Sequence, residues 1–477
     1  MKLLNYSPLG SLKGLTFATV VGGAAIFGAF HNFSWQEYFY PATGDFYVPE
    51  SIYKTNASFF NNSSENKAYS SVLREKSRSI LLSLDGEKGT DAVKRINDYT
   101  LKISMPCGSG TAWILDYVIP EDGKYPTKWF IATNVHVISD LRFASNPYNQ
   151  ILPISLEQTQ RLQKRYKHMY EDMDPAHERA CISSAYGFSS INLFRESTPT
   201  TSESNSTVYY TTIKEPKLFY AAINFLGYRY SERGKAWWND NYYKDFAVLE
   251  IDFQTEDRAK KITDDFYNKY GKNATQSSKH APLNIFDKEL MAKYSSQELD
   301  KSNTNYYISG YPVVQRGDYT RFTNLDSFSQ RASVLSYAHD SISVKNIHGD
   351  PIRGMVDVYE IDKAHKNTAT VWQGRKLYNW GYNYLIENVH MRGGASGSLT
   401  VDKEGNVLGL YRMHDSARNL GFVEPLRSNG LYVDSKVILP KYDLIKGAEG
   451  QTNSYKQQLD RYYPNAKTFL KEKGWKI

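Results

Sequence analysis

The sequence predicts a mainly β chain with helical segments inserted between the strands and a helical C-terminal tail. Short runs rich in β-branched and aromatic residues recur along the chain and are bounded by Gly, Pro and Asn, which is typical of a barrel or sandwich. Residues 155–180 and 454–475 have the composition of helices instead. A chain of 477 residues also buries a large core without metal or disulfide staples.

Composition and motifs exclude several classes of function. The formal net charge of +7 is small for this length, and Lys and Arg form no dense stripe, so we expect no nucleic-acid partner. The sequence has no HExxH motif, no pair of CxxC motifs and no GxxxxGK[ST] loop, so we predict neither a metal nor a cofactor. His168 and His177 lie in the helical interval and are expected to be solvated.

The first 30 residues have the features of an export segment. Lys2 and Lys13 precede an apolar run at residues 15–30, LTFATVVGGAAIFGAF. Its length of 16 residues lies between that of a typical signal-peptide core and that of a full membrane span. A cleaved signal peptide and an uncleaved anchor therefore both stay open, and a buried helix of the folded domain is a third alternative. The lysines place the remaining chain outside the cell. No Cys lies within or directly after the run, which excludes a bacterial lipoprotein anchor.

The chain divides into consecutive regions. We expect a signal peptide or membrane anchor at 1–30, a spacer and N-terminal extension at 31–100, a first β-barrel at 101–253 with an insertion at 150–215, a linker at 254–303, a second β-barrel at 304–440 and a helical tail at 441–477. Cys107 and Cys181 are too few for a disulfide framework, and their pairing stays open because sequence does not give their distance.

Three short segments carry the residues of a nucleophilic site. His136 follows an apolar strand in IATNVHVI, where an imidazole on a rigid element is placed to act as a general base. Asp245 stands before the buried run at 246–251 and is suited to orient the imidazole, with Asp240 and Asp252 as alternatives. Each of these residues alone has a simpler reading as a surface or turn residue.

Ser396 lies in the glycine-rich segment RGGASGSLTV. A serine hydroxyl becomes a nucleophile only when a base takes its proton and the oxyanion that it forms is stabilised. Glycines let the backbone turn so that successive N–H groups point toward that oxyanion. We therefore predict Ser396 as the nucleophile, and the N–H groups of Gly394 and Ser396 as the oxyanion donors.

The segments GSGT, ATNVHVI, DFAVLEI, SGYP and GASGSLTVDKEGNVLGLY together resemble the chymotrypsin-fold serine proteases, in the order His, Asp, Ser. This resemblance implies two β-barrels, with His136 and Asp245 in the first and Ser396 in the second. The 109 positions from His136 to Asp245 and the 151 from Asp245 to Ser396 exceed the spacing of compact members, and loop insertions can absorb the difference.

The chain is more specifically similar to the mycoplasma immunoglobulin-cleaving serine protease family. This resemblance rests on the export segment, the long interval between His and Asp, and the motifs ATNVHVI and GGASGS. It implies a secreted or membrane-anchored surface protease that cleaves the heavy chain of immunoglobulin G after a separate immunoglobulin-binding protein has captured the antibody. The alternatives are an extracytoplasmic quality-control protease and an inactive protease-fold binding protein.

Three residues are candidates for the specificity pocket. His390 stands where trypsin-like enzymes have an Asp, so cleavage after Arg or Lys is not predicted. Tyr411 stands where glutamyl endopeptidases have a His, so cleavage after Glu is not predicted either. Arg412 follows Tyr411 and is expected to line the same side.

Overall fold

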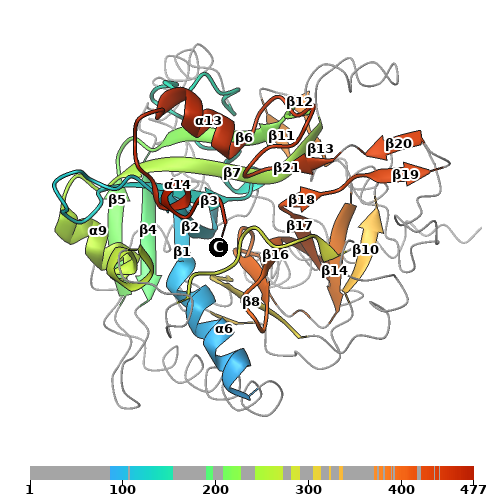
Figure 1. Ribbon diagram of the computed structural model, residues 1–477, viewed down its shortest axis with the longest axis horizontal. Helices are drawn as coiled ribbons and strands as arrows, with labels where there is room; N and C mark the ends of the chain where they lie inside the picture. Colours follow the sequence, from blue (N-terminus) through green and yellow to red (C-terminus); the bar gives the residue numbers. More distant parts are fainter. Residues whose placement is uncertain are drawn as a thin grey trace, which may run out of the picture.

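Strands dominate the structure, which confirms the mainly β prediction (Figure 1). The computed structural model describes residues 86–105, 108–153, 190–196, 208–226, 242–271, 281–290, 305–312, 322–323, 332–336, 370–372, 375–379, 382–387, 389, 391, 393–415, 420–433, 436–439 and 441–476. The predicted export segment, Cys107 and Cys181 lie outside these residues. In the described part of the chain, no helix is long and apolar enough to cross a membrane.

The first sheet comes almost wholly from the N-terminal half of the chain. Its strands are β1 (Thr100–Met105), β2 (Gly108–Tyr117), β3 (Lys128–Thr133), β4 (Ile191–Glu196), β5 (Val208–Ile213), β6 (Lys217–Ile223), β7 (Tyr242–Asp252) and β13 (Tyr378–Asn379). Their order is β13-β7-β3-β2-β1-β4-β5, with β6 also paired to β7. The late strand β13 runs parallel to β7, so a segment from the second half of the chain completes this sheet.

The second sheet is formed by strands from the C-terminal half. They are β8 (Tyr306–Gly310), β9 (Phe322–Thr323), β10 (Ala332–Ser336), β14 (Tyr382–Glu387), β15 (Leu399–Asp402), β16 (Val407–Asp415) and β17 (Leu420–Pro425). They follow the order β10-β14-β17-β16-β15-β8-β9. Shorter strand pairs join β11 (Val371–Trp372) to β12 (Arg375–Lys376), β18 (Arg427–Ser428) to β21 (Tyr442–Asp443), and β19 (Leu431–Val433) to β20 (Lys436–Leu439).

Helices join the two sheets and cover the first one. The helical elements are α6 (Gly86–Tyr99), η3 (His136–Ile138), α9 (Glu256–Thr263), the π-helix η7 (Tyr267–Gly271), α13 (Tyr455–Tyr462) and α14 (Phe469–Glu472). Helix α6 contacts β2 of the first sheet and both β8 and β15 of the second. Helices α13 and α14 pack against β6 and β2, and they confirm the prediction of terminal helices (Figure 1).

A buried carboxylate in β2 fastens this helical tail to the first sheet. Asp116 accepts hydrogen bonds from the Tyr455 hydroxyl at 2.9 Å and from the backbone N–H of Leu470 at 3.0 Å. Burial raises the pKa of Asp116 to about 6, although these hydrogen bonds oppose the shift. The tail is therefore held by a group whose charge changes in mildly acidic solution.

The interval at residues 150–215 differs in part from the expected insertion. Strand β4 pairs with β1, and β5 pairs with β4, so both strands belong to the first sheet. Long polar segments surround both strands in the sequence, so the local pattern did not predict them. The helical composition at 155–180 lies outside the described residues.

Candidate active site

His136 lies at the end of a buried strand of the first sheet. Strand β3 ends at Thr133, whose hydroxyl donates to the carbonyl oxygen of Thr111 at 2.7 Å and so fixes this end of the strand to β2. The side-chain amide of Asn134 donates to the backbone carbonyl of Asp245 at 2.6 Å. The single turn η3 then begins at His136, whose side chain is buried beside β7.

Asp245 lies inside β7, not before the strand as the sequence predicts. The charged residues Lys244 and Asp245 are both fully buried, and the strand continues through them. Partners from the second sheet compensate these charges. Glu424 of β17 pairs with Lys244, and its Oε2 accepts the backbone N–H of Asp245 at 3.1 Å. A local hydrophobic pattern does not reveal such partners, which explains the late start predicted for the strand.

His136 and Asp245 contact each other twice. Nδ1 of His136 lies 2.6 Å from Oδ2 of Asp245, and the backbone N–H of His136 donates to Oδ1 at 3.0 Å. An ionised carboxylate accepts a hydrogen bond from Nδ1–H, so the proton stays on Nδ1 and Nε2 is the basic nitrogen of the ring. Nε2 is buried and has no hydrogen-bond partner within the described residues. This arrangement is the one that a general base requires.

Arg412 of β16 adds a positive charge to this pair. Its Nε donates to Oδ2 of Asp245 at 3.1 Å, and one of its terminal nitrogens donates to the Tyr243 hydroxyl at 3.1 Å. Burial by itself raises the pKa of Asp245, but the interactions with His136 and Arg412 outweigh it and hold that pKa below its ordinary value. Asp245 is therefore ionised at neutral pH.

Ser396 stands in a tight turn between β14 and β15. Gly394 and Gly397 flank it with φ angles of 91° and 92°, in the region that favours glycine. Thr111 of the first sheet holds the turn from both sides: its N–H donates to the Ser396 carbonyl at 2.7 Å, and its hydroxyl donates to the Gly394 carbonyl at 2.9 Å. The turn that carries the serine is thus docked directly on the sheet that carries the histidine.

The Ser396 hydroxyl donates to the backbone carbonyl of Arg412 at 3.2 Å. The structure therefore joins His136 directly to Asp245, and it links Ser396 to Asp245 through Arg412. Rotation about the Cα–Cβ bond of Ser396 redirects the hydroxyl away from that carbonyl, and catalytic hydrogen bonds commonly tighten only when a substrate is bound.

The other predicted site residues lie in different surroundings. Tyr411 is fully buried, and its hydroxyl donates to the Met391 carbonyl at 2.6 Å, ahead of the Ser396 turn. The Arg412 side chain is directed at Asp245, so only its backbone remains for a role in a specificity pocket. His390 and Asp240 lie outside the described residues, and Asp252 is exposed at the far end of β7.

Sequence reasoning missed the residues that support the site from a distance. Thr111, Tyr243 and Glu424 have no motif around them that indicates their role. The segment GSGT, quoted for the resemblance, ends at Thr111, but it did not indicate that this threonine holds the Ser396 turn. Their side chains reach the site only because the two sheets pack together.

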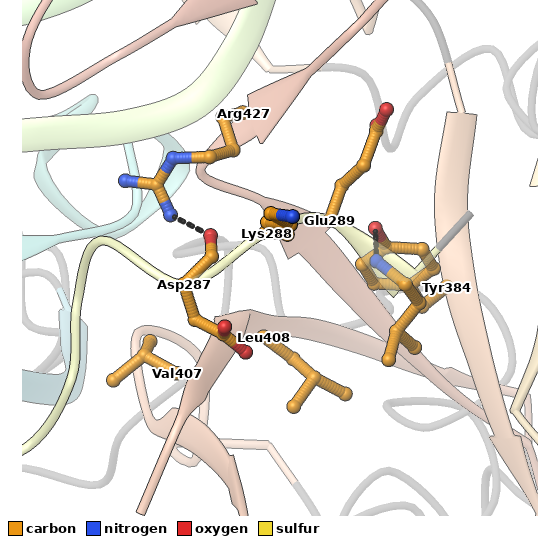
Figure 2. A pocket seen from close by; sticks show the side chains of 8 residues that line it. Asp287, Lys288, Glu289, Tyr384, Val407, Leu408 and Arg427 are labelled. Atoms are coloured by element: carbon orange, nitrogen blue, oxygen red, sulfur yellow. Dashed lines mark hydrogen bonds between the residues drawn. The ribbon is translucent and has the colours of Figure 1, made fainter. Parts of the chain in front are cut away.

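A small pocket is lined by residues other than those of the candidate site (Figure 2). Residues 287–290, Tyr384, Val407, Leu408 and Arg427 line it. Arg427 donates to the Asp287 carbonyl at 2.9 Å and pairs with Asp443, also at 2.9 Å. Glu289 accepts the backbone N–H of Asn429 at 2.8 Å. These contacts fasten residues 281–290 to β18, and they assign the pocket's polar groups to structural support.

Comparison with known families identifies the chain. The model of the mycoplasma immunoglobulin protease family matches residues 58–413, which include His136, Asp245 and Ser396. The chain belongs to this family. The matched region contains all strands of the first sheet and the strands of the second sheet except β17, and it ends within β16.

Relatives of this family member are found in Ureaplasma and Mycoplasma species. It is 23% identical over 435 residues to a membrane-associated lipoprotein of Ureaplasma parvum, covering 75% of this chain and 49% of the relative. It is 22% identical over 400 residues to an uncharacterised lipoprotein of Mycoplasma genitalium, covering 72% of this chain and 77% of the relative. The chain thus spans about half the length of the Ureaplasma protein.

Solved structures also show a likeness to the family member. The structure of the mycoplasma MIB and MIP proteins matches with a TM-score of 0.42 and 16% identity, covering 76% of this chain and 59% of the other. The active form of the Rv3671c protease from M. tuberculosis matches with a TM-score of 0.26 and 13% identity, covering 70% of this chain and 78% of the other.

Proposed function

We propose that this family member is a serine endopeptidase at the cell surface that cleaves the immunoglobulin heavy chain together with a separate immunoglobulin-binding protein. The hydrogen-bonded pair of His136 and Asp245 carries the proposal, because it orients a base beside the sheet on which the Ser396 turn is docked. Membership of an immunoglobulin protease family supports the substrate class. The proposed chemistry requires no metal or cofactor.

The reaction proceeds by acyl transfer. Nε2 of His136 takes the proton of the Ser396 hydroxyl as Oγ bonds to the carbonyl carbon of the scissile peptide. The backbone N–H groups of Gly394 and Ser396 stabilise the oxyanion. The intermediate collapses, the leaving amine takes the proton from His136, and an acyl-enzyme remains on Ser396. Water, deprotonated by the same imidazole, then hydrolyses the acyl-enzyme and restores the serine.

The location of the protein follows from its N-terminal region and its relatives. The apolar run at residues 15–30 is suited to export, and two relatives are named lipoproteins. Because no Cys lies within or directly after that run, we infer attachment by the apolar segment itself where the segment is retained. A surface location brings the enzyme to host antibody.

Labelling and cleavage together test this function. A fluorophosphonate probe reacts only with an activated serine, so we expect labelling at Ser396 in the full chain, with mass spectrometry locating the adduct. Incubation with immunoglobulin G and an antibody-binding partner should release heavy-chain fragments, whereas Ser396→Ala should release none.

The outcomes separate the alternatives. Absence of labelling in folded protein, with the partner present, would reject the enzyme and favour a binding protein. Labelling with degradation of casein but not of native antibody, again with the partner present, would retain the serine protease and reject the antibody as its substrate. The first result concerns the chemistry of the site, and the second concerns only its specificity.

A further inference from the structure

Arg412 touches both halves of the candidate site with different atoms. Its guanidinium donates to Oδ2 of Asp245 at 3.1 Å, and its backbone carbonyl accepts the Ser396 hydroxyl at 3.2 Å. The residue is 6% exposed, so solvent screens neither contact strongly. A single residue of β16 therefore bridges the carboxylate of the first sheet and the serine of the second.

The guanidinium is held firmly and stays charged. It donates to the Tyr243 hydroxyl at 3.1 Å, lies 5.9 Å from the centre of the Tyr243 ring, and reaches the Met413 sulfur at 3.4 Å. An arginine does not lose its proton in the ordinary pH range. Asp245 consequently faces a fixed positive charge at every pH at which the protein is folded.

This charge acts on the oxygen that His136 uses. Oδ2 of Asp245 receives both Nδ1 of His136 at 2.6 Å and Nε of Arg412 at 3.1 Å. The carboxylate normally stabilises the imidazolium that forms when histidine takes the serine proton. A guanidinium on the same oxygen cancels part of that negative charge, so the imidazolium is stabilised less.

The remaining charges nearby are largely paired with each other. Lys244, on the same strand as Asp245, forms a buried ion pair with Glu424 of β17. Glu424 also accepts the side-chain amide of Asn379 in β13 at 2.5 Å. The hydroxyl of Tyr243 is a further titratable group in contact with Arg412. The field at Asp245 is therefore set chiefly by His136 and Arg412, which are also its main electrostatic partners.

We propose that Arg412 is a positioning residue of this site: it fixes Asp245 against His136 and extends the activity of the enzyme to lower pH. The inference rests on the proposed serine protease function. The positive charge makes protonation of the free imidazole less favourable, so the base stays available in more acidic solution. The terminal nitrogens of the guanidinium are held by Tyr243 and Met413, so the hydrogen bond from Nε also fixes the position of Oδ2 of Asp245.

Two variants separate charge from geometry. Arg412→Gln removes the charge, and we expect the acidic midpoint of the pH profile of kcat/KM to move up by about one unit. Arg412→Lys keeps the charge but loses the fork, so we expect a midpoint within about 0.3 units of wild type and a kcat/KM lowered about tenfold. The substrate is a short peptide, which needs no antibody-binding partner.

Arg195→Gln is the matched control. Arg195 of β4 is also a buried arginine, and it donates to the carbonyl oxygens of Asn97 and Asp98 in α6, at 3.3 and 2.6 Å. Its replacement should lower the free energy of unfolding and leave the acidic midpoint where it is. A shift of the midpoint in this control equal to that in Arg412→Gln would overturn the assignment to Arg412.

A second readout does not depend on turnover. The proton on Nδ1 of His136 is followed by NMR in the full chain, and its titration should move in the same direction in Arg412→Gln. If the wild type labels with fluorophosphonate and neither midpoint moves, the inference about Arg412 is wrong. If the wild type fails to label, the proposed function fails, and the NMR titration still decides whether Arg412 acts on the pair. If Arg412→Gln does not fold, an unchanged kcat/KM in Arg412→Lys rejects the positioning role.

Discussion

His136 and Asp245 on the first sheet are held by charge, whereas Ser396 on the second sheet is held by its backbone. The histidine and the aspartate lie in a buried cluster with Arg412, and Lys244 and Glu424 form an ion pair beside it. The serine turn uses two glycines with positive φ and two hydrogen bonds from Thr111, all without a charged side chain.

This difference determines how each half responds to change. A buried charge that loses its partner is costly, because the remaining charge has neither water nor a counter-ion around it. A turn that depends on glycine tolerates changes of charge nearby but not an added side-chain carbon. We therefore expect the pair of His136 and Asp245 to be sensitive to pH and charge, and the Ser396 turn to be sensitive to shape.

Removing the nucleophile should have the largest effect on activity. Ser396→Ala is expected to lower kcat by about a factor of 10⁶, because the remaining groups cannot form the acyl-enzyme. The free energy of unfolding should change by only about 1 kcal/mol, since one hydrogen bond to Arg412 is lost. Peptide hydrolysis and urea denaturation measure the two effects. Retained turnover would assign the chemistry to another residue.

Removing the charge of Asp245 should affect both activity and stability. Asp245→Asn is expected to lower kcat by about a factor of 10⁴, because an amide no longer fixes the required tautomer of His136. It also leaves Arg412 buried without its counter-ion, at a cost of about 3–5 kcal/mol. Kinetics and denaturation of the same preparation test both. A loss of activity with unchanged stability would contradict the buried charge cluster.

Adding one carbon to the serine turn should disturb its shape. At Gly397 a Cβ atom would meet the Thr133 hydroxyl at 2.7 Å and the Thr111 carbonyl more closely, so Gly397→Ala should cost at least about 2 kcal/mol and reduce kcat about 100-fold. Gly450→Ala is the control, because Gly450 has φ of 80° and no atom within 4 Å of an added Cβ. If both changes lowered the free energy of unfolding equally, backbone strain alone would explain the effect at Gly397, and the contacts with Thr111 and Thr133 would add nothing.

Asp116 shows whether sensitivity to charge extends beyond the site. Its pKa is raised to about 6, so the charged form is disfavoured in the folded state, and the stability that the neutral form gives is lost as pH rises from about 4 through 6. Asp116→Asn stays neutral and should remove this loss, which amounts to about 3 kcal/mol. Denaturation between pH 4 and 7 compares the two proteins. Parallel pH curves would disprove the assignment to Asp116.

Much of the fold was predictable because its signals are local, and the three candidate site residues were proposed from signals of the same kind. Buried β-branched runs predicted β3 and most of β7, and the glycines around Ser396 predicted a tight turn. Strands β4 and β5 were missed because polar segments surround them. The start of β7 was placed too late because its buried charges do not follow the pattern of an apolar strand.

By itself, the sequence determined the order of the chemical groups and the need for glycine beside Ser396, because both depend on neighbouring residues. Only the tertiary structure brought Arg412 to Asp245 across 167 positions, Glu424 to the same strand across 179, and Thr111 to the Ser396 turn across 283 or more. Such contacts depend on how two sheets pack and in which register. No local propensity carries that information, because the residues meet only when the core is formed.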